Sequence, residues 1–172
     1  MDGAFSAVAP DTFPTVAPTV FREAMARLGA AVHIITTAGP GGRTGLTATA
    51  VCSVSDMPAT LLVCINRRAQ SSGILTENGA LCVNTLHAGQ EAIANFFAKS
   101  TADKSRAFDT KDWITLTTGS PVLESAVVAL DCRIVEWRVV ATHIVIYAAV
   151  EAVHNGPLGP ALVYHDRAYK HV

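Results

Sequence analysis

The sequence lacks an excess of charge of either sign, and it lacks any long apolar run. Its 13 Lys and Arg residues nearly balance 14 Asp and Glu residues, without a basic stripe or an acidic tail. We therefore expect no nucleic acid partner and no binding to a membrane surface. No apolar run approaches the roughly 20 residues that a transmembrane helix needs. The first residues lack the charge and apolar pattern of a secretory signal, so we expect a cytoplasmic protein.

Several nucleotide-site and catalytic motifs are also missing. No G-x-G-x-x-G follows a predicted strand, and there is no G-x-x-x-x-G-K, so a Rossmann domain and a P-loop are disfavoured. A G-x-S-x-G elbow and His-rich metal motifs are absent, which argues against a serine hydrolase and a metal site. The four cysteines form no C-x-x-C pair, and we expect buried, reduced thiols, with Cys52 as the one candidate exception.

What is present is a sequence rich in short β patterns. Half of the residues are apolar, enough for one well-packed domain. Thr19 is expected to cap a first helix that ends at Gly29, and residues 1–18 read as an arm before a single domain, 19–172. Neighbouring strands joined by short links favour a mainly β, antiparallel barrel with peripheral helices. We predict strands at 31–37, 46–55, 60–66, 80–86, 127–139, 143–153 and 160–170, helices within 67–79 and at 90–98, and a polar surface flap at 99–119.

The most informative predicted strand is 46–55, because none of the side chains on one of its faces is large. That face carries four hydroxyls among the five residues at odd positions from 47 to 55, and the other face is apolar. A wall of compact side chains lets the backbone approach the polar edge of a flat heteroaromatic ligand. A half-exposed strand with its hydroxyls in water would show the same alternation, so both interpretations stand.

A second candidate site lies where a predicted strand meets a predicted helix, at residues 66–73 (NRRAQSSG). A helix N-terminus offers free N–H groups and a partial positive charge, which suit a phosphate; ordinary N-capping needs no ligand. Two histidines are further candidates. His143 is expected at the mouth of a strand, and His165 lies in the segment YHDRAY.

Taken together, these segments resemble the short-chain flavin reductases, the FMN-binding split-barrel oxidoreductases that serve two-component monooxygenases. The resemblance covers about residues 20–170, and within the family it is strongest toward the reductases of pyrimidine-ring-opening and 4-hydroxyphenylacetate oxygenase systems. It rests on motifs that occur in the same order: FREAMARLGAAVHIITT (21–37), GLTATAVCSVSDMP (45–58), LLVCINRRAQSSGIL (61–75), LCVNTLHAGQEAIANFFA (81–98), the His143 position and LVYHDRAY (162–169).

The resemblance implies an NADH- or NADPH-dependent reductase of FMN or FAD, a homodimer, whose reduced flavin diffuses to a partner monooxygenase. His143 would lie near the nicotinamide, where hydride transfer needs no essential general base. Alternatives are an FMN-dependent oxidase on a similar barrel and a non-enzymatic flavin-binding or redox-sensing module. The residues that the resemblance assigns to the cofactors are Ala48, Thr49, Ala50, Val51, Cys52, Val54 and Ser55 along the flavin; Ala69, Gln70, Ser71, Ser72, Gly73, Ile74 and Leu75 around its phosphate; Phe97 beside it; and His143, Tyr164, His165, Asp166 and Arg167 at the nicotinamide.

One departure from the family pattern affects this assignment. Many relatives carry Gly-Asp before the histidine, whereas Ala141 and Thr142 precede His143 here. A carboxylate at that position could orient the imidazole, so the sequence leaves open what holds the ring of His143.

Overall fold

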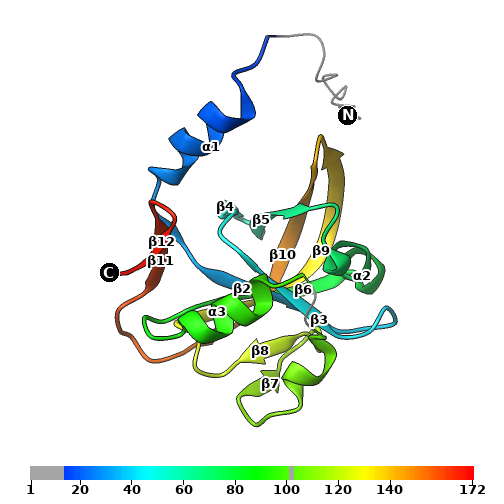
Figure 1. The fold of residues 1–172 in the computed structure, drawn as a ribbon. Helices are drawn as coiled ribbons and strands as arrows, with labels where there is room; N and C mark the ends of the chain where they lie inside the picture. Colours follow the sequence, from blue (N-terminus) through cyan, green and yellow to red (C-terminus); the bar gives the residue numbers. More distant parts are fainter. Residues whose placement is uncertain (1–13, 101–102) are drawn as a thin grey trace.

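The computed structural model describes residues 14–100 and 103–172. Strands dominate, the paired strands are antiparallel, and the helices lie outside the main sheet (Figure 1). The predicted mainly β architecture with peripheral helices is confirmed. Most of the predicted arm, residues 1–13, lies outside the described residues, so the division at residue 18 stays a prediction.

The described part of the chain contains four helical segments and twelve strands. The helices are α1 (Pro18–Ala26), α2 (Gln70–Asn78), α3 (Glu91–Ala98) and the 3-10 helix η1 (Ser105–Phe108). The strands are β1 (Ala30–Ala31), β2 (His33–Thr37), β3 (Thr44–Ala48), β4 (Val51–Asp56), β5 (Ala59–Asn66), β6 (Ala80–Thr85), β7 (Trp113–Thr115), β8 (Pro121–Leu123), β9 (Val128–Val140), β10 (His143–Asn155), β11 (Leu162–His165) and β12 (Ala168–His171). None of these helices is long and apolar enough to cross a bilayer.

The main sheet has seven strands in the order β3-β2-β6-β9-β10-β5-β4. Its two edge strands, β3 and β4, follow each other in the chain and are joined only by Thr49 and Ala50, which we call the crossover. The single strand predicted over residues 46–55 is therefore wrong: its first half pairs with β2 and its second half with β5, at the opposite edge. The crossover brings the two edges of the sheet together, which curls the sheet into a split barrel.

Three other predictions of local structure need correction. Helix α1 begins with Pro18 at its first position, and no side chain caps it, so Thr19 is not its cap. Residues 160–170 form two strands rather than one, because Asp166 and Arg167 adopt left-handed φ values of 47° and 57° and turn the chain back. Cys64 is only partly buried, whereas Cys82 and Cys132 are buried as expected and Cys52, the candidate exception, is exposed.

The predicted surface flap at 99–119 is anchored in the core instead. Phe108 is buried, and its ring lies 4.9 Å from the ring of Trp113 and 5.6 Å from that of Phe97. Sequence spacing could not show this contact, because the segment has no regular period and its aromatic residues meet α3 only in the folded chain.

Two apolar cores share strand β2, which is buried along its whole length. Ile34 packs in the first core, with Phe97 of α3 and the aromatic rings described above. Ile35, its neighbour, faces the second core, which fills the barrel with Val63 and Ile146 among others. Because side chains alternate across a strand, β2 separates the barrel interior from the α3 layer.

Gly45 of β3 lets α3 approach this sheet closely. A Cβ atom at position 45 would lie 2.9 Å from Cε1 of Phe97 and 3.1 Å from the carbonyl oxygen of Ile35. We expect Gly45→Ala to lower the free energy of unfolding by about 2 kcal/mol, because the added methyl group would force the buried ring of Phe97 or the backbone of Ile35 to move. Urea unfolding measures this change.

The matched control is Gly73→Ala, in the middle of α2, where an added Cβ meets nothing within 4 Å. That substitution should leave stability unchanged or raise it by about 1 kcal/mol, the usual difference between Ala and Gly in a helix. Equal effects of the two substitutions would contradict the close approach at Gly45.

Burial also makes the stability of this fold depend on pH. Desolvation lowers the pKa of His33 from 6.5 to about 4, while its Nδ1 lies 3.0 Å from the hydroxyl of Thr85. Below pH 6.5 His33 is protonated in the unfolded chain, whereas in the folded chain it stays neutral until about pH 4. The free energy of unfolding therefore falls as the pH is lowered from 6.5 to about 4, by about 3 kcal/mol in total. Urea unfolding between pH 7.5 and 4.5 should show a shallower loss in His33→Gln, whereas His165→Gln, at an exposed histidine, keeps the wild-type slope.

Candidate functional site

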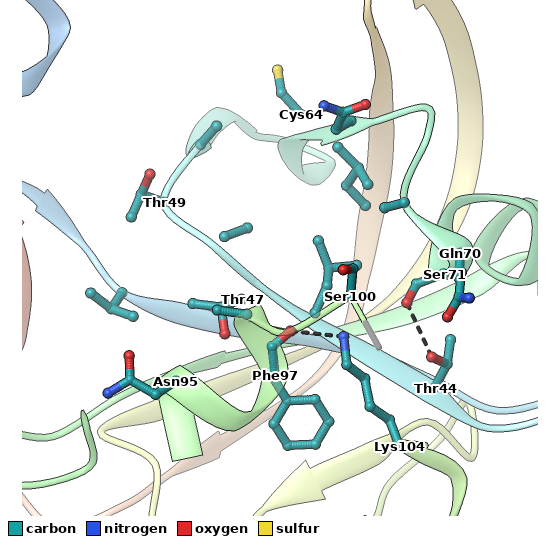
Figure 2. A pocket seen from close by; sticks show the side chains of 18 of the residues that line it. Thr44, Thr47, Thr49, Cys64, Gln70, Ser71, Asn95, Phe97, Ser100 and Lys104 are labelled. Carbon is teal, nitrogen blue, oxygen red and sulfur yellow. Dashed lines mark hydrogen bonds between the residues drawn. The ribbon is translucent and has the colours of Figure 1, made fainter. Parts of the chain in front are cut away.

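A cavity of about 920 Å³ opens where the crossover joins the two edges of the sheet. Its wall is made by β3, the crossover, the end of β5, the start of α2, the end of α3 and the β11–β12 turn. Figure 2 shows wall residues from the first five of these segments. These segments are far apart in the sequence, and the closure of the barrel brings them together. A volume of this size is in the range of small-molecule and cofactor sites.

Five consecutive residues, 46–50, line one side of this cavity. Consecutive residues cannot all face one way from a regular strand, so this wall depends on the break after β3. Ala48, Thr49 and Ala50 are compact, and Thr49 and Ala50 are exposed to solvent in the described chain. Thr47 is held from behind, since its hydroxyl donates to the carbonyl oxygen of Ala94 in α3 at 2.6 Å. The wall therefore fits a flat ring that contacts the backbone edge.

The start of α2 lines the opposite end of the cavity through Gln70 and Ser71. The helix begins at Gln70, with Ala69 at the N-cap and no side-chain cap, so its first N–H groups have no side-chain acceptor there. The buried hydroxyl of Ser71 lies 3.1 Å from that of Thr44. Gly79 ends the helix with a left-handed φ of 66°, as its position in the sequence predicted. This end of the cavity suits an anion.

Lys104 supplies a positive charge near this end, although sequence reasoning missed it. Its ammonium donates to the carbonyl oxygen of Phe97 at 2.8 Å, and its side chain reaches the cavity wall (Figure 2). Partial burial lowers the pKa of this Lys. Arg43, also in the wall, forms an ion pair with Asp109 at 2.6 Å, so its charge is balanced. Lys104 instead donates to a neutral carbonyl group, which does not balance its charge. No sequence motif pointed to Lys104, because the polar segment that carries it has no regular pattern.

His143 begins β10 at the tip of the long β9–β10 hairpin and reaches the cavity, as expected of a residue at a strand mouth. The hydroxyl of Thr142 lies 2.9 Å from Nδ1 of His143. A hydroxyl can donate to or accept from this nitrogen, so Thr142 can orient the ring in either tautomer. Ala141 adopts a left-handed φ of 50°, a conformation that a glycine would adopt at less cost.

The structure brings just over half of the sequence-assigned residues to this cavity. Those in its wall are Ala48, Thr49, Ala50, Ala69, Gln70, Ser71, Ile74, Phe97, His143, Tyr164 and Arg167. Those outside it are Val51, Cys52, Val54, Ser55, Ser72, Gly73, Leu75, His165 and Asp166. The wall residues that sequence reasoning did not single out include Thr44, Asn95, Lys104 and Tyr169, whereas Asn66, the first residue of the predicted site at 66–73, also lies in the wall.

Physical reasons account for the residues that lie outside the wall. Strand β4 leaves the cavity after the crossover, and Val51, Cys52 and Ser55 line a separate hollow of about 490 Å³ instead. Leu75 is fully buried in the barrel core, as the helical period after Ser71 and Ser72 requires. The hydroxyl of Ser72 donates to the backbone carbonyls of Ala69 and Arg67, at 2.8 and 3.0 Å.

Within residues 14–100 and 103–172, which the structure describes, no group of three or more His, Cys, Asp or Glu side chains lies close enough together to hold a metal ion. The cavity instead combines small apolar groups, hydroxyls, amides and a few cations, a donor set that suits an organic anion.

Comparison with known protein families now decides the family. The model of the flavin reductase-like domain matches residues 25–172. The chain belongs to the flavin reductase-like family. The predicted resemblance and the predicted class of enzyme, a flavin reductase, are thereby confirmed.

Individual flavin reductases agree with this assignment. The FMN reductase (NADH) RutF 1 of Methylorubrum extorquens is 53% identical over 150 residues, 87% of this chain and 74% of that protein. A crystallised Haemophilus somnus protein considered to be a flavin reductase is 44% identical, with a TM-score of 0.86 over 91% of this chain and all of that one. BorF, the flavin reductase component of a bacterial two-component tryptophan halogenase, is 24% identical with a TM-score of 0.85 over 91% of this chain and 98% of that one, and shares the fold.

The position of Lys104 in this flavin reductase leads to a binding prediction. We expect Lys104→Met to weaken FMN binding about tenfold, since a hydrogen bond to a charged group contributes about 1.5 kcal/mol. Riboflavin, which lacks the phosphate, should lose less than twofold. Quenching of flavin fluorescence on titration measures both affinities.

Lys99→Met is the matched control, because Lys99 is exposed, follows α3 directly and is not in the cavity wall. It should bind both flavins as the wild type does. Equal losses for FMN and riboflavin in Lys104→Met would show that Lys104 supports the fold rather than a phosphate.

Proposed function

We propose that this chain is an NADH-dependent FMN reductase whose reduced flavin leaves to serve a flavin-dependent monooxygenase. The observation that carries the proposal is the crossover cavity, with its compact wall and its anion-binding end, in a chain about half identical to FMN reductases (NADH). Each half of the cavity matches one part of FMN: a flat ring system and a phosphate. The cavity is also open to solvent along Thr49 and Ala50, which suits a flavin that is released after each turnover.

The flavin ring would lie against Ala48, Thr49 and Ala50, where the backbone can approach its polar edge. The ribityl phosphate would lie at the start of α2, near Gln70, Ser71 and Lys104. Phe97 belongs to the wall, but its side chain is fully buried, so it would support β3 next to Gly45 rather than offer the flavin an exposed surface. Four residues of β4 lie outside this cavity, so they would contact a flavin only if it extended beyond the cavity or was bound by a second subunit. These residues are Val51, Cys52, Val54 and Ser55.

The nicotinamide would enter between His143 and Tyr164, both in the cavity wall. The redox chemistry comes from the two cofactors when both are bound, with hydride moving from the reduced nicotinamide to the flavin. The chain's own part is to hold the rings in contact and to exclude water, so we expect no essential general base. His143, oriented by Thr142, would position the nicotinamide rather than exchange a proton.

We also propose a homodimer, on the basis of exposed apolar surface. No residue of α1 is buried, and Val20, Phe21, Met25 and Leu28 in or next to it are each about half exposed. The outer part of β9 carries another such surface at Val135, Trp137, Val139 and Val140. Exposed apolar groups in this number are typical of a protein interface. Analytical ultracentrifugation tests this proposal directly.

Steady-state kinetics test the proposed activity. NADH oxidation should be slow in the purified protein alone and should rise in proportion to added FMN, with FAD and riboflavin as comparisons. Reduced flavin should appear in free solution under anaerobic conditions. NADH-independent oxidation of another substrate would favour an FMN-dependent oxidase, and flavin binding without turnover would favour a redox-sensing module.

His143→Ala tests the assignment of the nicotinamide site. We expect the KM for NADH to rise about tenfold, the loss of one good contact, while the Kd for FMN changes less than twofold. His154→Ala, on the same strand but away from the cavity, should change neither value. A similar loss of FMN affinity in His143→Ala would place this residue at the flavin instead.

A further inference from the structure

An ion pair lies at the end of the cavity where the proposed phosphate site is found. Nη2 of Arg43 donates to Oδ1 of Asp109 at 2.6 Å, and this contact joins the loop before β3 to the segment after η1. Arg43 belongs to the cavity wall, yet its side chain is 45% exposed and that of Asp109 is 54% exposed. A wall residue that is half exposed lies at the rim of a cavity, so we call Arg43 and Asp109 the rim pair.

The rim pair is held next to the start of α2 by contacts on both sides of its loop, residues 38–43. Directly after Arg43, the hydroxyl of Thr44 lies 3.1 Å from that of Ser71 in the first turn of α2 (Figure 2). Within the loop, the N–H of Gly41 donates to the side chain of Asn78, the last residue of α2, at 2.8 Å. The loop is thus bonded to α2, and the rim pair in turn bonds it to the segment after η1.

The charges at this end of the cavity match one phosphate group and not two. Arg43 is balanced by Asp109, whereas Lys104 forms no ion pair within the described part of the chain. Asp103 is a second carboxylate in the wall, and hydrogen bonds from the hydroxyl and the N–H of Ser105 hold its pKa below the ordinary value. An additional phosphate at the rim would therefore meet two carboxylates and a guanidinium that is already paired.

The three common flavins differ at the end of the molecule that would lie here. Riboflavin has no phosphate, FMN has one, and FAD has a second phosphate bonded directly to the first, followed by adenosine. With the first phosphate at the start of α2, the second phosphate of FAD cannot lie far from it and has to approach the rim pair. A guanidinium suits a phosphate well, but here its N–H donors already serve a carboxylate.

We infer that Asp109 is a specificity-determining residue, which makes the cavity bind FMN in preference to FAD because it occupies Arg43 and repels the second phosphate. This inference rests on the proposed reductase function and adds to it the residue that limits the tail of the flavin. An unfavourable charge can reject one ligand without improving the affinity for the other. The rim pair is exposed, so its effect is moderate and weakens as salt rises.

Binding of the three flavins to Asp109→Asn and to the wild type tests this inference without turnover. Equilibrium dialysis at low ionic strength, followed by flavin absorbance, gives each Kd. We expect the Kd for FAD to fall about fivefold in Asp109→Asn, because a carboxylate is removed beside the second phosphate and Arg43 becomes free to bind it. The Kd for FMN should fall less than about twofold, and that for riboflavin should not change, since neither has a group at the rim.

Three further variants make the result specific. Asp112→Asn removes the same charge from an exposed residue of the same segment, outside the cavity wall, and should leave every Kd unchanged. Asp109→Glu keeps the charge and should keep the preference for FMN. In Asp109→Asn/Arg43→Gln the gain for FAD should disappear, because the freed guanidinium is lost. Circular dichroism and urea unfolding establish that each variant is folded.

The inference is overturned if folded Asp109→Asn keeps the wild-type ratio of the two Kd values, for FAD and FMN, or if both flavins gain equally. A gain for FAD that persists without Arg43 would also contradict it. The proposed function is judged separately, by whether the wild type binds FMN and reduces it with NADH. A wild type that does both, combined with an unaltered ratio in Asp109→Asn, rejects the role of Asp109 alone.

Discussion

The pairing of one short segment with both edges of the same sheet is the constraint on which the rest of this molecule depends. Strand β3 completes one edge and β4 completes the other, so the two residues between them must span the opening of the barrel. Neither Thr49 nor Ala50 belongs to a strand, and both residues line the cavity that results. Closure of the barrel and formation of the ligand site are therefore the same structural event.

The α3 layer keeps this arrangement in place from outside. Thr47 donates to α3, and Gly45 allows Phe97 to pack closely against β3. Phe97 in turn contacts Phe108 and Trp113, which belong to a segment that is otherwise polar. The same packing positions Lys104, since its ammonium is held by the last turn of α3. The aromatic cluster that stabilises the fold thus also determines where the charge of Lys104 lies in the cavity wall.

Charge is distributed unevenly along the cavity, and this matches the two ligands that a flavin reductase must hold. Lys104 and the start of α2 lie at one end, where one phosphate would bind. Arg167 lies at the other end and is matched by Glu23. The cavity centre has small and apolar groups between them. A molecule that must exchange both ligands gains from this pattern, because few strong charge contacts have to be broken on release.

The sequence by itself determined the family, the β-rich fold, the end of α2 at Gly79 and the place of His143 at a strand mouth, because these depend on local periodicity, turn chemistry and ordered motifs. It did not determine that residues 46–55 divide between the two edges of the main sheet. The alternation of side chains along a strand is the same whichever strand it pairs with. Only the tertiary structure placed Lys104 in the cavity and Glu23 on Arg167. Those contacts join segments between 7 and 144 residues apart, and no local pattern encodes them.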